Sequence, residues 1–482
     1  MQYNEMEAMA RIPPSPGNGC PGSSCGHLCS LYDSGIRRDQ GRFIMSRKEK
    51  QDRSIMSTVA AIEDRLFYRL DYIWPVKRVL HKGIMAVAHA VFPRFRDTII
   101  AEGPGAIKDV GPFIKDQGFK KALIMTDATL VKIGLAKKLT DSLDAAGIGY
   151  AIYDQVVPDP TIQNVEEGYA LYKKENCDII IGLGGGSPMD SAKVVSGRVV
   201  RPNRTTDNLG GLFAVTLPNL GWALKKPANY PKIICIPTTS GTGAETTFSC
   251  VITNPDTGRK YTVNDLCVMP DYVVLDPELT LGVPAKMTAY TGIDALSHLT
   301  EAYVGDGHNK ESDEISREGI KLVFDWLDKA VEEPDNIEAR TAMMKAAHLG
   351  GKELIAGVTT YAHPFAHKTG ALTHITHGYC IGTYLPYFLE FYRPQADKRL
   401  AELADVIGVG QGMKTKDKAE AYIQAIRDMC EKYGIDGHIP EVADFDFKDF
   451  IRSVRTESFA YPVPKQISNR QVKKLLKTVA GK

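Results

Sequence analysis

The sequence predicts a chain of two structural halves, a parallel α/β half followed by an all-helical half. Between about residue 97 and residue 283, short and nearly all-apolar segments of strand length alternate with segments of helical periodicity. That pattern is typical of a parallel sheet covered by helices on both faces. After Pro284 the segments become long and rich in Ala, Leu, Glu and Lys, and no strand pattern of comparable quality follows. The boundary is therefore expected near residue 284.

The elements of the α/β half follow from this alternation in order. Strands are expected at residues 98–101, 121–126, 149–153, 178–182, 232–236 and 272–275. Helices are expected to end near residue 117, to cover residues 135–146 and 164–175, and to begin after the glycine-rich stretch at 184–187. Glycine and proline clusters at 103–105 and 157–160 mark turns between them.

The helical half is read from its apolar periodicity. Helices are expected at residues 288–303, 314–333, 337–354, 397–407 and 416–432. At 482 residues the chain exceeds one typical domain, so two domains with additions are expected.

The N-terminal residues differ from the rest of the chain. Residues 1–56 lack an apolar core and contain a proline- and glycine-rich stretch, which predicts a disordered leader. Apolar spacing over residues 57–96 predicts a helical extension that packs on the domain or on a second subunit. Cys20, Cys25 and Cys29 form a close group whose spacing matches no established zinc pattern.

The charge, the cysteines and the apolar segments of the chain argue against several classes of partner and of protein. The net charge of +1 gives no electrostatic reason to expect nucleic acid or an anionic membrane. The other six of the nine cysteines are scattered, which favours reduced core residues in a cytoplasmic protein over a disulfide framework. No apolar segment has the length of a secretory signal or a bilayer span.

Four of the eleven histidines, His363, His367, His374 and His377, fall within fifteen residues. Upstream, Asp294 and His298 are spaced four apart, so on a helix they leave the same face one turn from each other. A carboxylate and an imidazole so placed can share one divalent cation, and the downstream cluster can complete its coordination shell. The pattern indicates a metal enzyme.

The cluster can supply ligands only if its backbone breaks. On one unbroken helix His363 and His377 would lie roughly 21 Å apart, at about 1.5 Å per residue, too far to share an ion. Gly370 and the weakly helical residues 373–376 offer a place for the chain to double back. The alternative is a plain polar stripe of solvated or core histidines on one helix face.

Two loops follow buried strands. Gly184, Gly185, Gly186 and Ser187 open a helix, and a helix N-terminus with close backbone approach suits a phosphate. The loop matches neither the dinucleotide fingerprint nor the Walker A pattern, so a tight turn without a ligand is the alternative. The second loop, Pro237 to Thr247, is rich in hydroxyls that could line a cofactor.

Asp127 follows the expected strand at 121–126. An acidic residue there can bind the hydroxyls of an adenosine ribose. It can equally serve as a helix N-cap, and the sequence leaves both roles open.

Four motifs occur in order: Gly-Gly-Gly-Ser-Pro-x-Asp-x-x-Lys, Pro-Thr-Thr-Ser-Gly-Thr-Gly-x-Glu, Gly-Ile-Asp-Ala-Leu-x-His and the terminal His-Gly of the histidine cluster. Together they resemble the iron-containing (group III) alcohol dehydrogenase family over about residues 97–482. The resemblance implies a dehydroquinate synthase-like architecture, with a Rossmann-like dinucleotide-binding domain at 97–283 and an all-α metal-binding domain at 284–482. Residues 1–96 stay outside it.

The resemblance also implies roles for single residues. Asp294, His298, His363 and His377 would hold the metal, typically Fe²⁺, with Zn²⁺, Mn²⁺ or Ni²⁺ as substitutes. His367 would be a catalytic proton carrier near the nicotinamide and not a ligand. The implied cofactor, NAD, would be bound by Asp127, Gly184, Gly185, Gly186, Ser187, Pro188, Met189, Asp190, Thr238, Thr239, Thr247 and Lys260.

The implied reaction is hydride transfer between nicotinamide and a metal-bound alcohol or aldehyde, in a cytoplasmic homodimer or higher homo-oligomer. Two residues depart from the family pattern: Asp159 stands where many members have asparagine, and His374 where Asn or Asp is usual. The alternatives are a glycerol dehydrogenase, a dehydroquinate synthase-like lyase, or a non-catalytic assembly protein.

Overall fold

The computed structural model describes residues 37–39, 42–44, 98–206, 209, 230–256 and 259–482. Most of the predicted leader, including Cys20, Cys25 and Cys29, and all of the predicted extension at 57–96 lie outside the described residues. Residues 1–59 and 60–482 form separate compact units. In the first unit, β1 (Arg37–Asp39) and β2 (Arg42–Ile44) pair antiparallel.

The second unit opens with a six-stranded parallel sheet. Its strands are β3 (Ile99–Glu102), β4 (Lys121–Met125), β5 (Gly149–Tyr153), β6 (Ile179–Gly184), β7 (Lys232–Pro237) and β10 (Tyr272–Leu275). They lie in the order β3-β10-β7-β6-β4-β5, and every neighbouring pair is parallel. All six are the strands that the sequence predicts, because short apolar runs such as β6 bury both faces.

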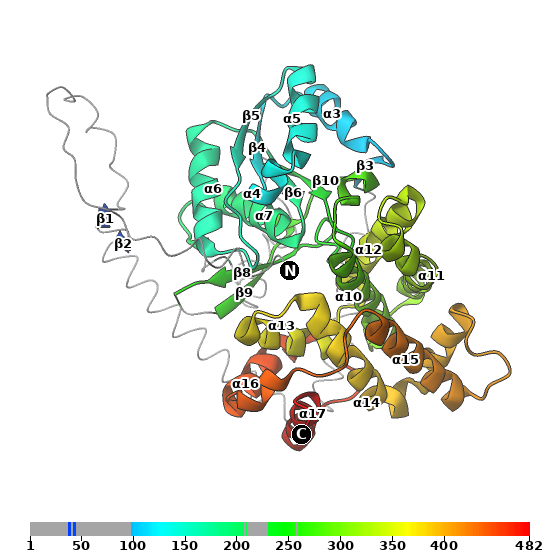
Figure 1. The fold of residues 1–482 in the computed structure, drawn as a ribbon. Coiled ribbons are helices and arrows are strands. Elements are labelled where there is room, and N and C mark those ends of the chain that lie inside the picture. Colours follow the sequence, from blue (N-terminus) through cyan, green and yellow to red (C-terminus); the bar gives the residue numbers. More distant parts are fainter. Residues whose placement is uncertain (1–36, 40–41, 45–97, 207–208, 210–229, 257–258) are drawn as a thin grey trace, which may run out of the picture. The chain divides into compact units, whose positions relative to one another are not determined.

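Helices cover both faces of this sheet (Figure 1). One core joins the sheet to α3 (Val110–Asp116) and α5 (Leu135–Ala146), and the other joins it to α6 (Ile162–Lys174) and α7 (Gly186–Val200). The short helices η2 (Ala106–Asp109) and α4 (Ala128–Lys132) precede α3 and α5. The predicted doubly covered sheet is confirmed.

An antiparallel hairpin between β7 and β10 was not predicted. It consists of β8 (Ser249–Asn254) and β9 (Arg259–Asn264). Every second residue of β8 is buried, namely Cys250, Ile252 and Asn254. One of these three is polar, so the sequence shows only two apolar residues in alternation, which is too short a pattern to predict a strand. The 3₁₀ turns η4 (Leu266–Val268) and η5 (Pro277–Thr280) lie on either side of β10.

From residue 285 the described chain is helical. Its α-helices are α10 (Ala285–Val304), α11 (Lys310–Glu332), α12 (Ile337–Ala356), α13 (Ala362–Thr373), α14 (His377–Val406), α15 (Thr415–Lys432), α16 (Phe447–Glu457) and α17 (Asn469–Val479). The 3₁₀ turns are η6 (Pro440–Asp444) and η7 (Ser458–Ala460). No helix among the described residues is both long and apolar enough to cross a membrane.

The prediction of a helix at 397–407 was too short. Helix α14 begins twenty residues earlier, and Pro386 and Pro394 lie inside it. Each proline removes a backbone hydrogen bond, which is why the sequence argues against a helix there. Burial of Tyr384, Leu385 and Phe388 in the helical core stabilises it nevertheless.

Candidate metal and cofactor site

Helix α10 brings two of the predicted metal ligands together. Asp294 and His298 lie one turn apart on it, and both are buried. The His298 Nε2 and Asp294 Oδ1 atoms are 3.7 Å apart. Almost the whole helix is buried, and Gly292 lets the side chain of Leu327 approach its backbone closely. The helix is therefore a fixed support for the pair.

The predicted break in the histidine cluster is confirmed. Helix α13 ends at Thr373, and His374 takes a left-handed conformation with φ of 59° while its N–H donates to the Gly370 carbonyl at 2.8 Å. Helix α14 then begins at His377. The start of α13, at His363, and the start of α14 are thereby brought to the same place.

The two histidines converge on the carboxylate of α10. The Asp294 Oδ1 atom lies 3.8 Å from His363 Nε2 and 3.3 Å from His377 Nε2. Donors bound tetrahedrally at about 2.1 Å from one ion are about 3.4 Å apart, so these separations are those of a shared metal. Asp294, His298 and His363 are buried, whereas the His377 side chain is 37% exposed.

The unsatisfied polar atoms at this place also fit a cation. Among the described residues Asp294 Oδ1 and His363 Nε2 are buried without a hydrogen-bond partner. Burying such atoms unpaired is costly, and native proteins rarely do so. A divalent cation among them would replace the missing partners.

The protonation states of Asp294 and His298 suit metal ligands. Burial lowers the pKa of His298 to about 3. Burial alone would raise the pKa of Asp294, but the imidazoles of His298, His377 and His363 hold it below its ordinary value. A charged carboxylate beside a neutral imidazole is the state that binds a metal.

Glu301 orients one of the predicted ligands, and the sequence reading assigned it no role. It lies on α10 beyond His298 and accepts a short hydrogen bond from His363 Nδ1. Its other oxygen accepts from the N–H groups of Thr360 and Ala362 at 3.1 and 3.0 Å. Because the carboxylate fixes the proton on Nδ1, the His363 Nε2 lone pair is left for a cation. Spacing by seven from Asp294 was the signal that could have found it.

His367 lies beside this group of donors. Its ring stacks on the ring of His377, with centroids 5.0 Å apart and 20° between the planes. Its Nδ1 lies 2.6 Å from Oε1 of Glu457, at the end of α16. The sequence offered no signal for Glu457, which stands ninety residues further along the chain.

The predicted cofactor loops meet at one edge of the sheet. Strands β7, β6 and β4 are neighbours, and at their carboxyl ends stand Thr238, Gly185 and Asp127. The order of the strands reverses between β6 and β4, and such a reversal is where α/β sheets bind ligands. The structure thus brings the two loops and Asp127 to the carboxyl edge of three adjacent strands.

The backbone of the first loop is shaped by its glycines. Gly184 has φ of 148°, and a Cβ there would lie 2.6 Å from Pro188 Cγ. The fifteen-residue helix α7 then begins at Gly186, and Gly185 caps it without a side-chain bond. Its first N–H groups, on Gly186 and Ser187, therefore remain for an anion.

Asp127 is an N-cap, one of the two roles left open by the sequence. Its Oδ1 accepts from the N–H groups of Thr129 and Leu130 at 2.9 and 3.0 Å. Both bonds end on the same oxygen, so Oδ2 can still accept a hydroxyl hydrogen bond.

Two predicted cofactor-lining side chains, Asp190 and Thr247, are bound to the same lysine. The fully buried Lys193 ammonium donates to Asp190 Oδ1 at 3.2 Å and to Thr247 Oγ1 at 3.0 Å. It also donates to the carbonyls of Ala244 and Ser249, each at 2.9 Å. Lys193 therefore ties α7 to the second loop, a role that its place in the motif did not indicate.

Lys260 and Asp159 also form a pair. Lys260 Nζ on β9 lies 2.6 Å from the carboxylate of Asp159, which stands in the loop after β5 with φ of 57°. Asp and Asn tolerate this conformation better than most residues. The departure from asparagine at position 159 therefore adds a charge that Lys260 balances.

Comparisons with known proteins show what the chain is similar to. The model described as iron-containing alcohol dehydrogenase matches residues 97–277, and the C-terminal model of the Fe-containing alcohol dehydrogenase family matches residues 288–480. The NAD-dependent methanol dehydrogenase of Bacillus methanolicus is 35% identical over 69% of this chain and 84% of its own length. The 1,3-propanediol dehydrogenase of Citrobacter freundii is 32% identical over 78% of this chain and 95% of its own.

A solved structure extends the similarity to the fold. The alcohol dehydrogenase from Oenococcus oeni matches with a TM-score of 0.73 and 33% identity, over 80% of this chain and 99% of that one. The chain belongs to the iron-containing alcohol dehydrogenase family. As a member of that family it is an alcohol dehydrogenase and thus an oxidoreductase.

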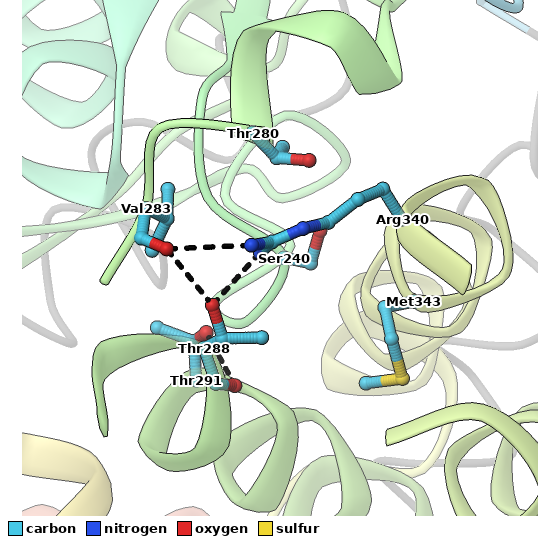
Figure 2. Close-up of a pocket in the computed structure, with 7 residues that line it drawn as sticks. All are labelled: Ser240, Thr280, Val283, Thr288, Thr291, Arg340 and Met343. Carbon is cyan, nitrogen blue, oxygen red and sulfur yellow. Dashed lines mark hydrogen bonds between the residues drawn. The ribbon is translucent and has the colours of Figure 1, made fainter. Parts of the chain in front are cut away.

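This alcohol dehydrogenase also has a small cavity whose lining includes none of the four proposed metal donors (Figure 2). It lies where Ser240 of the second loop meets Arg340 of α12 and the start of α10. Arg340 donates to Thr288 Oγ1 at 2.8 Å and to the Val283 carbonyl at 3.3 Å. With space of about 10 Å³ it has room for about one water molecule and not for a substrate.

Proposed function

We propose that this family member is a metal-dependent, NAD(H)-linked alcohol dehydrogenase and aldehyde reductase. One observation carries the proposal: three imidazole nitrogens lie within 3.8 Å of one buried carboxylate oxygen that has no hydrogen-bond partner among the described residues. A structural polar cluster would be expected to pair these atoms with donors. A divalent cation explains why three imidazole nitrogens face a carboxylate oxygen that has no hydrogen-bond partner.

In this proposal Asp294, His298, His363 and His377 hold the cation, with Fe²⁺ first and Zn²⁺, Mn²⁺ or Ni²⁺ as substitutes. When bound, the cation would acidify the alcohol hydroxyl, and NAD would accept the hydride. The N–H groups of Gly186 and Ser187 bind the pyrophosphate at the start of α7. His367 accepts the alcohol proton and returns it in aldehyde reduction.

Asp127 supports NAD over NADP. A free carboxylate oxygen there accepts a ribose hydroxyl and repels a 2′-phosphate. The methanol dehydrogenase relative is named NAD-dependent, which agrees with this preference. The named substrates of the relatives, methanol and 1,3-propanediol, support a small alcohol or its aldehyde as substrate.

We further propose a dinucleotide-binding domain at 97–283, a metal-binding domain at 284–482 and a homodimer or higher homo-oligomer located in the cytoplasm. The disordered leader at 1–56 and the helical extension at 57–96 remain predictions.

The test is NADH oxidation by protein reconstituted anaerobically with Fe²⁺, across C2–C6 aldehydes, lactaldehyde and hydroxyaldehydes. We expect steady turnover with at least one aldehyde, its loss on chelation and its return with metal. Protein that binds one metal and NADH but turns over no aldehyde or alcohol would favour a lyase of similar architecture. Protein that binds neither would favour an assembly role.

A further inference from the structure

A carboxylate from a distant helix holds the histidine that stands beside the metal donors. Glu457 is the last residue of α16, and its Oε1 lies 2.6 Å from His367 Nδ1 on α13. The two side chains are about three-quarters buried. The same carboxylate oxygen accepts a hydrogen bond from the Tyr461 hydroxyl at 3.3 Å. Glu457 is thus itself fixed by a second contact.

This contact decides which nitrogen of His367 carries the proton. An ionised carboxylate only accepts hydrogen bonds, so Nδ1 is the protonated nitrogen. In the neutral ring Nε2 is then the basic atom, as in His363, whose Nδ1 is held by Glu301. Stacking on His377 fixes the plane of the His367 ring at the same time.

We propose that Glu457 is a positioning residue for proton transfer through His367. This inference rests on the proposed function. In alcohol oxidation the O–H bond breaks and its proton forms an N–H bond at Nε2, while the electron pair of the C–H bond leaves as hydride to NAD⁺. The resulting imidazolium is stabilised by the Glu457 carboxylate and later releases its proton to water. Aldehyde reduction runs the same steps in reverse.

The chain offers a matched control at the same helix interface. Lys368, the next residue on α13, pairs with Asp449 of α16 at 2.6 Å between Nζ and Oδ2. The Asp449 side chain is 62% exposed, and its pair with Lys368 is an ordinary surface pair of small energetic value. Asp449→Asn therefore removes a carboxylate between α13 and α16 without touching His367.

The experiment compares Glu457→Gln, Glu457→Asp and Asp449→Asn in the metal-loaded enzyme. In Glu457→Gln the amide NH₂ can donate to Nδ1 and move the ring proton to Nε2, the wrong nitrogen. We expect kcat to fall about 10- to 100-fold, the range for losing a residue that orients a catalytic group. Metal content and NADH affinity should stay unchanged, Glu457→Asp should recover part of kcat, and Asp449→Asn should match wild type.

A second readout does not need turnover. In protein labelled with ¹⁵N-histidine, the His367 ring, assigned with a His367→Gln variant, should show a proton on Nδ1 in wild type and lose it in Glu457→Gln. Normal kcat in Glu457→Gln, an equal loss in Asp449→Asn or loss of metal from Glu457→Gln would overturn the positioning role. An Nδ1–H that persists in Glu457→Gln would also overturn it. Absence of wild-type turnover with an intact Nδ1–H signal would instead count against the proposed function.

Discussion

The proposed metal end and the proposed nucleotide end of this enzyme would recognise their groups in different ways. At the metal end, side-chain atoms such as Asp294 Oδ1 and His363 Nε2 are buried and unpaired among the described residues. At the nucleotide end, the side chains of Asp190 and Thr247 are already bound to Lys193. Recognition would therefore fall to side chains at the first site and, apart from Asp127, to backbone N–H groups at the second. Mutations should then act differently at the two ends.

The largest expected effect is the loss of a metal ligand. His363→Ala and His377→Ala should each abolish metal binding and lower kcat/KM by roughly 100-fold or more, because the three remaining donors lose both the affinity and the geometry of the site. His363→Ala should also lower the melting temperature, since it leaves the buried carboxylate of Glu301 without its imidazole. The more exposed His377 should lack this second effect. Metal analysis and thermal melts of both variants measure these effects. Equal decreases in melting temperature for the two variants would contradict the prediction.

At the nucleotide end the largest effect should be on stability. Lys193→Met removes a fully buried ammonium and leaves Asp190 without its cation, with the Val251 N–H and the Cys250 side chain as remaining partners. Breaking a buried pair in this way costs about 3–5 kcal/mol. We expect a lower free energy of unfolding and weaker NADH binding, with normal metal content. Denaturant unfolding measures the first, and loss of metal would show that the two ends are not separate.

Glu301→Gln should be milder than ligand removal. The amide can still accept the backbone bonds from Thr360 and Ala362, but the charge that holds the proton on His363 Nδ1 is gone. Losing such a partner lowers metal affinity about 10- to 100-fold. Competition with a metal-binding dye measures this loss. A metal affinity equal to that of the wild type would show that Glu301 does not support metal binding.

Asp127→Gly should have a smaller effect, confined to cofactor choice and local stability. It replaces the Asp127 N-cap by glycine, which costs only about a few tenths of a kcal/mol, and removes the carboxylate oxygen proposed to repel a 2′-phosphate. The ratio of kcat/KM for NADPH to that for NADH should rise. Wild-type enzyme that uses NADPH as well as NADH would show that Asp127 is only a cap.

The smallest effect is expected at the N-terminus. Truncation before Ser57 should leave kcat/KM and oligomeric state unchanged, because every proposed metal and cofactor residue lies at or beyond Asp127. Truncation through Phe95 should weaken one of them. Kinetics and sizing chromatography on both truncated proteins measure kcat/KM and oligomeric state. Loss of activity on truncation before Ser57 would show that the leader has a role in catalysis.

The sequence predicted those features that depend on local residue patterns and missed those that depend on packing between distant helices. Apolar runs gave all six parallel strands, and the weak helical residues after Gly370 predicted the break that lets His363 and His377 meet. The length of α14 was underestimated because tertiary burial outweighs its prolines. Glu457 could not be found, since its contact depends on how α16 packs on α13.

The central claim, that one cation among Asp294, His298, His363 and His377 carries the activity, is tested most directly by metal stoichiometry against turnover. Wild-type enzyme would be titrated anaerobically with Fe²⁺, and bound metal and NADH oxidation would be measured on the same samples. We expect activity to rise linearly and to reach its plateau at one ion per chain, with no rise in His363→Ala. Full activity in metal-free protein would contradict the account.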